Sequence, residues 1–366
     1  MLIGRTIDRI VERITQPLDG PLLAILAALV TLGCLTLYSA APNRLPNQLI
    51  NVLVAFCMLW LAANVPPQQL MRFAVPAYFT GLILLIAVWK FGETANGAQR
   101  WLHVGVTRVQ PSEMMKIAVP LMLAWYFNRH ESVLKLRDYF VAFVLLILPV
   151  YLIAKQPDLG TAVLILAAGC YVIFLAGLSW KVLVTLVVAG AASLPLLWSV
   201  LHDYQRQRIL TLLDPTTDPL GAGYHIIQAT IAVGSGGILG KGWLAGTQAH
   251  LEFIPERSTD FVFAVFSEEF GLLGNCVLLL LYTALIMRGL MIAANAPNSF
   301  SRLLAGGITL TFFTYVFVNM GMVSGILPVV GVPLPLISYG GTALVTLLIG
   351  FGILMSIQKH RKLVNS

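Results

Sequence analysis

Long uninterrupted runs of apolar residues alternate with short polar connections along most of this chain. Each run has about 16 to 27 residues, the length of a membrane-crossing helix, whereas membrane-crossing strands give short segments of alternating polarity. The pattern predicts ten spans, at residues 21–40, 48–65, 73–91, 112–127, 139–154, 160–177, 182–201, 261–287, 303–323 and 334–357. Helices also satisfy their own backbone hydrogen bonds within lipid, so we expect an all-α, polytopic integral membrane protein.

Polar residues gather in one long segment, about 202–258, between the seventh and eighth predicted spans. A leader at residues 1–20 and a tail at residues 358–366 are the other polar stretches outside the short connections. We expect residues 1–366 to form a single membrane domain that carries one large loop. In the leader, Ile3, Ile7, Ile10 and Ile14 share one helical face, which is typical of a helix lying on a membrane surface. A disordered basic leader is the alternative.

Basic residues divide unequally between the two ends of the predicted helices. Thirteen fall at the end that carries both termini: Arg5, Arg9, Arg13, Arg72, Arg129, Lys135, Arg137, Lys181, Arg288, Arg302, Lys359, Arg361 and Lys362. Five fall in the short connections at the other end: Arg44, Lys90, Arg100, Arg108 and Lys155. The positive-inside rule therefore places both termini in the cytoplasm and the long loop outside. The fourth span is short and charged, and if it were re-entrant the termini would lie on opposite sides.

The composition agrees with a membrane protein and argues against other classes. Hydrophobic residues make up 58% of the chain and charged residues 11%, with a mean hydropathy of +0.84, whereas soluble domains carry about 25% charged residues. The net charge of +7 comes from scattered basic loops without a basic stripe, so we expect no nucleic-acid partner. All four cysteines (Cys34, Cys57, Cys170 and Cys276) fall in apolar spans, so neither disulfides nor a zinc site are expected.

Asp260 stands where the long polar segment ends and the eighth apolar run begins. An acidic side chain at a membrane boundary is costly to desolvate, which indicates a functional role. Positions 260, 264 and 268 follow one helical face, so Asp260 and Glu268 are expected to share an outward vestibule. The alternative for Glu268 and Glu269 is a pair of carboxyl groups hydrogen-bonded within the bundle. Gly271 and Gly274 allow a bend or a close helix approach.

Two further polar groups fall at predicted helix starts. Glu113 and Lys116 are three residues apart, so they can pair on a helix. Such a pair either anchors the fourth helix or lines an outward cavity, and Arg100 and Trp101 just upstream favour the cavity. Asp158 precedes the sixth span, where N-capping and a role in the site are compatible.

Glycine and proline mark two unusual segments. The connection from Asn319 to Gly341, which includes Ser338, has so many helix breakers that we expect a folded plug over an outer cavity. Residues 234–242 are glycine-rich but lack the glycine and hydroxyl positions of a phosphate-binding P-loop. A flexible loop is the simpler interpretation, although Lys241 could still meet a pyrophosphate as a point charge.

Several of these segments together resemble the SEDS family of bacterial shape, elongation, division and sporulation proteins, and within it the elongation branch. The matching segments, in family order, are Asn96–Trp101, Gln110–Glu113 with Lys116, Gln156–Thr161, Thr259–Phe261 with Glu268 and Glu269, and Pro333–Gly341. Two departures are Ala229, where the family usually has Ser, and Ser258, where His is common.

This resemblance implies a peptidoglycan glycosyltransferase of the bacterial cytoplasmic membrane that polymerises lipid II. It implies a class B penicillin-binding protein as partner, together with MreC- and MreD-type elongation proteins. Asp260 matches the family's essential acid and would serve as general base. The substrate-binding residues expected around it are Arg100, Trp101, Glu113, Lys116, Asp158, Arg206, Arg208, Lys241, Glu268 and Ser338.

Three alternatives stay open at this point. A divalent cation, Mg²⁺ or Mn²⁺, bridging Asp260 and the phosphates would make Asp260 a metal ligand. A lipid-linked oligosaccharide flippase is compatible with intramembrane charges and broken helices, although the chain shows no inverted repeat. A non-catalytic scaffold would leave Asp260 replaceable. The partner's transmembrane helix is expected on the eighth and ninth spans, where Gly306, Gly307 and Ser324 would permit close approach.

Overall fold

The computed structural model describes residues 18–362 except 96–97, 105–106, 131–133, 194–197, 199–202, 218–220, 252 and 255. The predicted leader helix (residues 1–17) therefore lies outside the described residues, as do the end of the tail (363–366) and most of residues 194–202 at the end of the seventh span. The main helices are α2 Gly20–Ala40, α3 Leu45–Asn64, α4 Pro67–Phe91, α5 Pro111–Arg129, α6 Leu136–Ala154, α7 Leu159–Leu175, α8 Trp180–Ala192, α13 Val262–Ala294, α14 Ser299–Val323 and α15 Gly341–Lys362.

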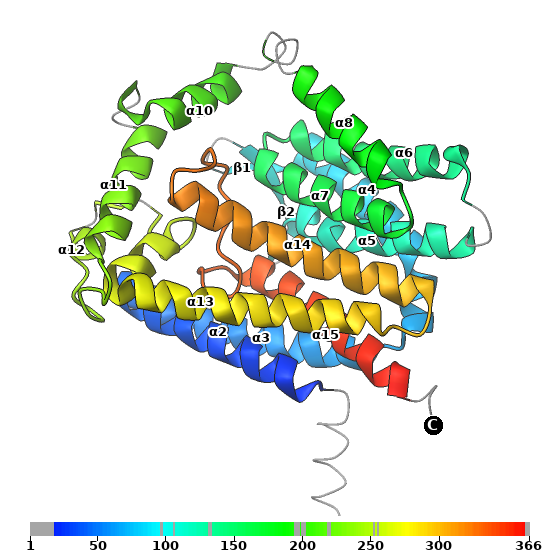
Figure 1. Cartoon of the computed structure of the whole chain (residues 1–366), viewed down its shortest axis with the longest axis horizontal. Coiled ribbons are helices and arrows are strands. Elements are labelled where there is room, and N and C mark those ends of the chain that lie inside the picture. Colours follow the sequence, from blue (N-terminus) through cyan, green and yellow to red (C-terminus); the bar gives the residue numbers. More distant parts are fainter. Residues whose placement is uncertain are drawn as a thin grey trace, which may run out of the picture.

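Each of the ten predicted spans overlaps one of these helices, and most of them lie side by side in one bundle (Figure 1). Within the described part of the chain, seven helices have the length and hydropathy to cross a membrane. Helix α5 is not among these seven, because its charged residues lower its hydropathy. It is nevertheless unbroken over 19 residues, or about 28 Å at 1.5 Å per residue. An unbroken helix of this length argues against the re-entrant alternative.

The most buried helices are α5 and α14, and their small residues explain this placement. Gly306 and Gly307 of α14 face the interior, since a Cβ at Gly306 would lie 2.5 Å from Leu175 Cδ1 and one at Gly307 2.6 Å from Val172 Cγ2. The expectation that these two glycines receive a partner's helix is therefore wrong. They allow α7 to approach α14 instead, and only Ser324 of that set is exposed.

A small antiparallel sheet interrupts the all-α architecture between α4 and α5. It consists of β1 Glu93–Ala95, β2 Ala98–Val104 and β3 Thr107–Val109, in the order β1-β2-β3. The strands are short and their sequence has no long apolar alternation, which is why hydropathy showed only a connection there. The sheet carries Arg100 and Trp101 in its middle strand.

The long polar segment is not an irregular loop. It contains α10 Asp203–Leu213, a 3₁₀ turn at Pro215–Thr217, α11 Ala222–Ser235 and the short α12 Thr247–His250. Figure 1 shows α8, α10 and α11 as an arch that leaves the bundle and returns to the start of α13.

Helix α13 is broken at Gly271, which adopts φ 63° and ψ −160°. The bend that the glycines allowed is therefore confirmed. The glycine-rich segment 236–242 satisfies the interrupted backbone. The amides of Lys241 and Gly242 donate to the carbonyl oxygens of Glu268 and Glu269, both at 3.0 Å.

The same segment also accepts hydrogen bonds from the far side of the break. The amides of Leu272 and Leu273 donate to the carbonyl oxygens of Gly237 (2.9 Å) and Ile238 (3.1 Å). The interpretation of residues 234–242 as a flexible loop is thus wrong. Gly236 and Gly240 allow the close backbone approach, since a Cβ at either would lie 2.1 Å from a carbonyl oxygen of α13, that of Ser267 or of Glu269.

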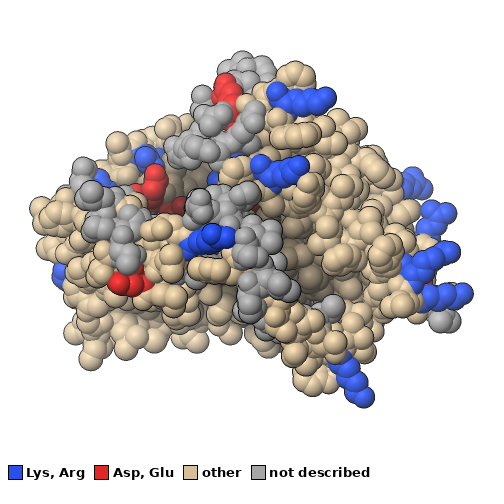
Figure 2. All heavy atoms as spheres, turned by 90° about the horizontal axis from the view of Figure 1, so that it is seen from above, with Lys and Arg blue, Asp and Glu red and all other residues tan. Residues whose placement is uncertain are grey.

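Basic side chains gather at one end of the molecule. Figure 2 shows Lys and Arg concentrated at the right-hand edge, the end where Figure 1 places the α5–α6 connection. At that end Arg288 of α13 forms a bidentate ion pair with Asp19, which also caps the first turn of α2. This asymmetry follows the positive-inside pattern of the sequence.

The break in α13 predicts a large effect of a single methyl group. Gly240→Ala should lower the free energy of unfolding by about 2 to 4 kcal/mol, because the new Cβ meets α13 backbone and φ is +79°. Thermal unfolding in detergent would measure the change. Gly237→Ala is the matched control, since φ there is also positive (+56°) but nothing lies within 4 Å. It should cost only about 1 to 2 kcal/mol, and equal losses in the two variants would contradict the packing argument.

Candidate active site

Asp260 lies in a tight turn immediately before α13. The Glu256 carbonyl oxygen accepts hydrogen bonds from the amides of Thr259 (3.0 Å) and Phe261 (3.3 Å), which close this turn. The Phe261 ring stacks on His225 of α11 with centroids 5.5 Å apart. The turn, together with the stacking, fixes the half-buried Asp260 side chain at the end of the bundle where α13 begins.

The irregular segment between α14 and α15 holds the Asp260 turn from the other side. Ser338 donates its hydroxyl hydrogen to the Thr259 carbonyl oxygen (2.6 Å) and accepts from the Leu334 amide (2.8 Å). The Tyr339 amide donates to the Ser258 carbonyl oxygen at 2.8 Å. Ser338 thus positions the backbone next to Asp260.

The tenth span accordingly begins later than expected, at Gly341 instead of residue 334. Pro333 and Pro335 cannot donate helical hydrogen bonds, and Leu336 has φ +67°. The segment's carbonyl groups bond instead to distant side chains, as when Tyr282 donates to the Pro335 oxygen at 2.7 Å. The segment is thus folded and irregular, as predicted, and residues 334–338 within it are buried; we refer to it as the plug.

Asn319 joins this segment to the Asp260 turn from the fully buried end of α14. Its Nδ2 donates to the backbone oxygens of Asp260 (2.8 Å) and Val332 (2.6 Å). Gly331 adopts φ +71°, and a Cβ there would lie 3.4 Å from Asp260 Oδ2, so this backbone forms a wall beside the carboxyl group. Asn319 therefore sets the distance between the turn and the plug.

The environment of Asp260 changes its acidity. Burial raises the pKa of the Asp260 carboxyl to about 6, and the nearby Glu256 charge acts in the same direction, whereas Arg100 opposes it. A carboxyl group with this pKa is largely ionised at neutral pH and can still accept a proton readily. Such tuning is typical of a general base.

Arg100, Gln110 and Asp158 form a polar cluster on one side of Asp260. The Arg100 guanidinium donates to the Pro157 carbonyl oxygen at 2.7 Å, and its Nε lies 3.8 Å from Asp158 Oδ2. Asp158 also caps α7 by accepting from the Thr161 amide (3.2 Å), so the predicted N-cap is confirmed. Gln110 donates to the same carboxylate at 3.3 Å. The cluster places the sheet against the starts of α5 and α7.

The predicted Glu113–Lys116 pair is also confirmed, with Lys116 Nζ 2.5 Å from Glu113 Oε1. Lys116 lies 4.8 Å from the ring centroid of Tyr315 on α14, and both charged residues are buried. The second carboxylate oxygen of Glu113 has no hydrogen-bond partner within the described structure. The pair therefore cross-links α5 and α14 beneath the site.

Glu268 and Lys241 form a separate cluster. Glu268 is fully buried and its carboxylate accepts from Lys241 Nζ (2.6 Å), the Thr247 amide (2.9 Å) and the Gln248 amide (3.1 Å). The side chain of Glu269 accepts from Ser39. Both carboxylates thus follow the alternative in which they are bonded inside the fold. Glu268 attaches the segment between α11 and α13 to the broken helix, and Glu269 joins the helix to the end of α2.

The remaining predicted residues lie on other elements. Trp101 is half-buried in β2, and alternation along the strand turns it to the face opposite Arg100. Arg206 lies on α10 and donates to the Trp198 carbonyl oxygen at 2.9 Å. Arg208 belongs to the same helix, with its side chain outside the described residues.

Sequence reasoning missed three contributors to the site. Asn319 was noted only as the start of an irregular connection, and Tyr315 lies within an apolar run. Arg44 entered only the charge count, yet it donates to Ser258, two residues before Asp260. Arg44 could have been found from the sequence, because it is a charged residue at the boundary of a predicted span. No sequence feature distinguishes Tyr315 from the other residues of its apolar run.

Comparisons with known proteins find relatives that match nearly the whole chain. Residues 21–363 match the sequence profile of the FtsW/RodA/SpoVE family, described as cell cycle proteins. The peptidoglycan glycosyltransferase MrdB of Escherichia coli strain K12 is 53% identical over 352 residues, which are 95% of this chain and 95% of the relative.

Two solved structures are similar over nearly the whole chain. One belongs to a peptidoglycan synthase complex that coordinates polymerization and crosslinking, with a TM-score of 0.83, 36% identity, and coverage of 94% of this chain and 98% of that chain. The other is the rod shape determining protein RodA of Thermus thermophilus, with a TM-score of 0.72, 30% identity, and coverage of 94% and 97%.

The two charges near Asp260 should shift its pKa in opposite directions. Glu256→Gln removes a negative neighbour and should lower the pKa of Asp260 below about 6, whereas Arg100→Gln removes a positive one and should raise it. Infrared titration of the carboxyl stretching band, identified by its loss in Asp260→Asn, would measure both. Lys90→Gln, an exposed charge at the end of α4, is the control and should leave the band unchanged. Shifts of the same sign in both variants would refute this electrostatic account.

Proposed function

This chain belongs to the FtsW/RodA/SpoVE family of cell cycle proteins, and we propose that it polymerises lipid II at the site around Asp260. It is a multi-pass membrane protein and a peptidoglycan glycosyltransferase. The observation that supports the site assignment is the carboxyl group of Asp260. It is half-buried at the outer end of the bundle, held by backbone contacts from two segments, and has a pKa of about 6.

The reaction joins two lipid-linked sugars. The 4-hydroxyl oxygen of the acceptor attacks the anomeric carbon of the donor, and the bond from that carbon to the pyrophosphate oxygen breaks. The acceptor hydroxyl proton passes to Asp260, and the lipid pyrophosphate leaves with the bonding electron pair. Asp260 therefore acts as general base, which contributes about 10²- to 10⁴-fold in rate.

Arg100 is positioned to stabilise the negative charge that develops on the leaving pyrophosphate. Its guanidinium is within electrostatic reach of Asp260 and is about a third exposed, so substrate can meet it. Lys116 is buried and already paired with Glu113, so we assign it a structural role, in which it holds α5 against α14 beneath the site. Asp158 and Gln110 orient Arg100 and the sheet that carries it.

A divalent cation is the alternative partner for Asp260. In the described parts of the chain no group of three or more His, Cys, Asp and Glu side chains is arranged to hold a metal ion. Asp260 alone would bind a metal only together with substrate phosphates, so we derive no step through it.

The two roles of Asp260 can be separated by metal rescue. Asp260→Cys should stay inactive with Mg²⁺, Mn²⁺ or Cd²⁺, because a general base is not restored by a thiophilic ion. Lipid II polymerisation with each ion in turn is the measurement. Recovery of activity with Cd²⁺, together with loss of Mg²⁺ activity, would identify Asp260 as a metal ligand instead.

We also propose the setting in which this enzyme works. The similar synthase complex couples polymerization to crosslinking, which supports a class B penicillin-binding protein as the crosslinking partner. MreC- and MreD-type proteins and lipid II complete the proposed assembly, at the cytoplasmic membrane of a bacterium. The basic end seen in Figure 2 would then face the cytoplasm, with Asp260 at the outer surface.

Removal of the base should abolish most of the activity. Asp260→Asn should polymerise lipid II at least about 10²-fold more slowly, with an unchanged unfolding temperature. The wild-type rate should also fall as the pH drops through about 6, because protonated Asp260 cannot accept the proton. Glycan chains made by the purified protein, with its penicillin-binding partner chemically blocked, give the readout.

Asp214→Asn is the matched control for this experiment. Asp214 is an exposed acid in the same outer segment, and its side chain accepts from Thr216 (3.0 Å from the amide). The variant should polymerise at the wild-type rate. Normal polymerisation by Asp260→Asn would remove the base assignment.

A further inference from the structure

Helix α3 carries three amide side chains in its first two turns, at Asn47, Gln48 and Asn51. Asn47 is exposed, whereas Gln48 is only 4% exposed and faces the interior. Asn51 lies against Gly341 at the start of α15, where a Cβ would come within 3.0 Å of its Oδ1. A buried amide in an apolar helix is costly unless its donor and its acceptor are both used, so the partners of Gln48 indicate its role.

Gln48 uses its amide group on the backbone of the plug. Its Oε1 accepts from the Gly340 amide at 3.2 Å, and its Nε2 donates to the Ser338 carbonyl oxygen at 3.5 Å. The amide of Tyr339, between these two residues, donates to the Ser258 carbonyl oxygen at 2.8 Å. Residues 338–340 are therefore bonded on one side to α3 and on the other side to the turn that precedes α13.

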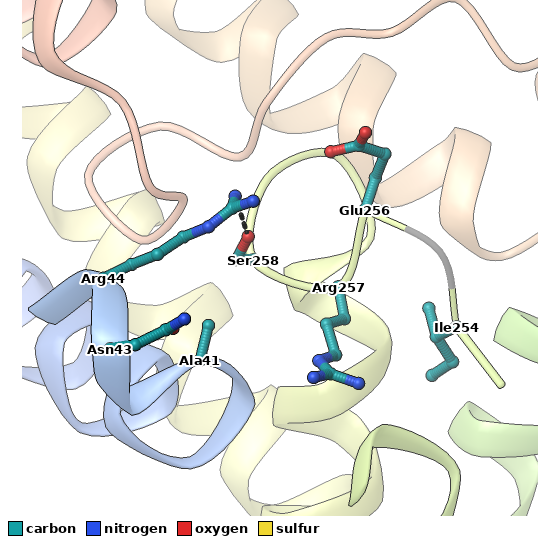
Figure 3. A pocket seen from close by; sticks show the side chains of 7 residues that line it. All are labelled: Ala41, Asn43, Arg44, Ile254, Glu256, Arg257 and Ser258. Atoms are coloured by element: carbon teal, nitrogen blue, oxygen red, sulfur yellow. Dashed lines mark hydrogen bonds between the residues drawn. The ribbon is translucent and has the colours of Figure 1, made fainter. Parts of the chain in front are cut away.

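The same face of α3 also reaches this turn directly. Arg44, one helical turn before Gln48, donates from Nη1 to Ser258 Oγ at 2.7 Å, and its guanidinium lies 5.3 Å from the ring centroid of Tyr339. Figure 3 shows this side chain extending from the α2–α3 connection to the turn that carries Ser258, where a dashed line marks the bond. Residues four apart lie on one face of a helix, so Arg44 and Gln48 hold neighbouring points of the turn and the plug.

Helix α2 contacts the plug through a glycine. A Cβ at Gly33 would lie 2.7 Å from the Leu336 carbonyl oxygen and 2.8 Å from Ile337 Cα, so the two backbones touch here. Leu336 has φ +67°, a conformation that a residue other than glycine keeps only where its surroundings hold it. The plug is therefore packed against α2 at Leu336 and hydrogen-bonded to α3 through Gln48.

We propose that Gln48 is a positioning residue of the active site, which holds Asp260 in place through the plug. Gln48 acts through residues 338–340, whose hydroxyl and amide groups bond to the backbone immediately before Asp260. Loss of the Gln48 amide releases these residues from α3 and lets the Asp260 turn move with them. The inference rests on the proposed function, because it assigns a further residue to the reaction at Asp260.

The kinetics of Gln48→Leu test this role, with a matched control at the other end of the same helix pair. Leu removes both hydrogen bonds at a similar volume, so kcat for lipid II polymerisation should fall about 10- to 100-fold while KM changes less than about threefold. Ser356→Ala removes another buried bond between α15 and α3, from Ser356 Oγ to the Val65 carbonyl oxygen at 2.5 Å. It should lower the unfolding temperature to a similar extent and leave kcat unchanged. An equal fall of kcat in the two variants would overturn the proposal.

Hydrogen exchange measures the positioning without turnover. In Gln48→Leu the amides of Tyr339 and Phe261 should exchange about 3- to 10-fold faster, because the plug and the turn open together. Ser356→Ala should leave both amides unchanged. Mass spectrometry of peptides that cover residues 256–262 and 336–341, from protein labelled in detergent, gives the readout. Normal kcat in Gln48→Leu, or a lower kcat with unchanged exchange in both peptides, would contradict the proposal.

Two further variants cover the case in which Gln48→Leu fails to fold. Gln48→Asn keeps a buried amide but shortens it by one methylene group, and its kcat should fall at least about fivefold. Gly33→Ala pushes the plug at Leu336 instead of releasing it, and its kcat should fall at least about 10-fold. Gly20→Ala, on the same helix with nothing within 4 Å of the new Cβ, should keep the wild-type kcat. Wild-type kcat in both Gln48→Asn and Gly33→Ala would remove the positioning role.

The Asp260→Asn variant separates this inference from the proposed function. Normal polymerisation by that variant would end the base assignment, and faster exchange in Gln48→Leu would then still show that α3 holds the turn. Inactive Asp260→Asn together with wild-type kcat and exchange in Gln48→Leu would leave the base assignment standing and remove the positioning role.

Discussion

Every backbone amide and carbonyl that leaves a regular helix at membrane depth must find a partner within the protein. This constraint explains most of the unusual features of the chain. Helix α13 breaks at Gly271, and residues 236–242 supply the missing partners. The connection from α14 to α15 is largely irregular, and the side chains of Asn319, Tyr282 and Ser338 form hydrogen bonds with its backbone. Asp260 lies beside the second of these, next to the connection from α14 to α15.

That location explains how an acid can be kept half-buried and ready to accept a proton. Asp260 is held mainly through its backbone and its neighbours, by Asn319 and Ser338, while its carboxyl group remains available. Arg100 and Glu256 then adjust its acidity from opposite directions. The fold therefore separates the groups that hold the residue in place from the groups that set its chemistry.

The sequence predicted local features well and long-range ones poorly. Apolar runs located the helices, because nearly every residue of a helix in lipid must be apolar. The pairing of Glu113 with Lys116 and the cap at Asp158 also followed from spacing of a few residues. Glu268 and Lys241 were assigned to substrate because nothing local shows that residues 27 positions apart bond to each other. The late start of α15 depended likewise on Gln48, whose side chain accepts from the Gly340 amide at 3.2 Å.

The interlocked backbone of α13 and the glycine-rich segment also limits how this protein can be recombined with its relatives. Neither piece is a self-contained module, because each completes the hydrogen bonding of the other across about 30 residues of sequence. In a chimaera that exchanges only the segment between α11 and α13, the new backbone would not align with the unpaired groups at the break in α13. A working exchange must therefore carry both pieces together.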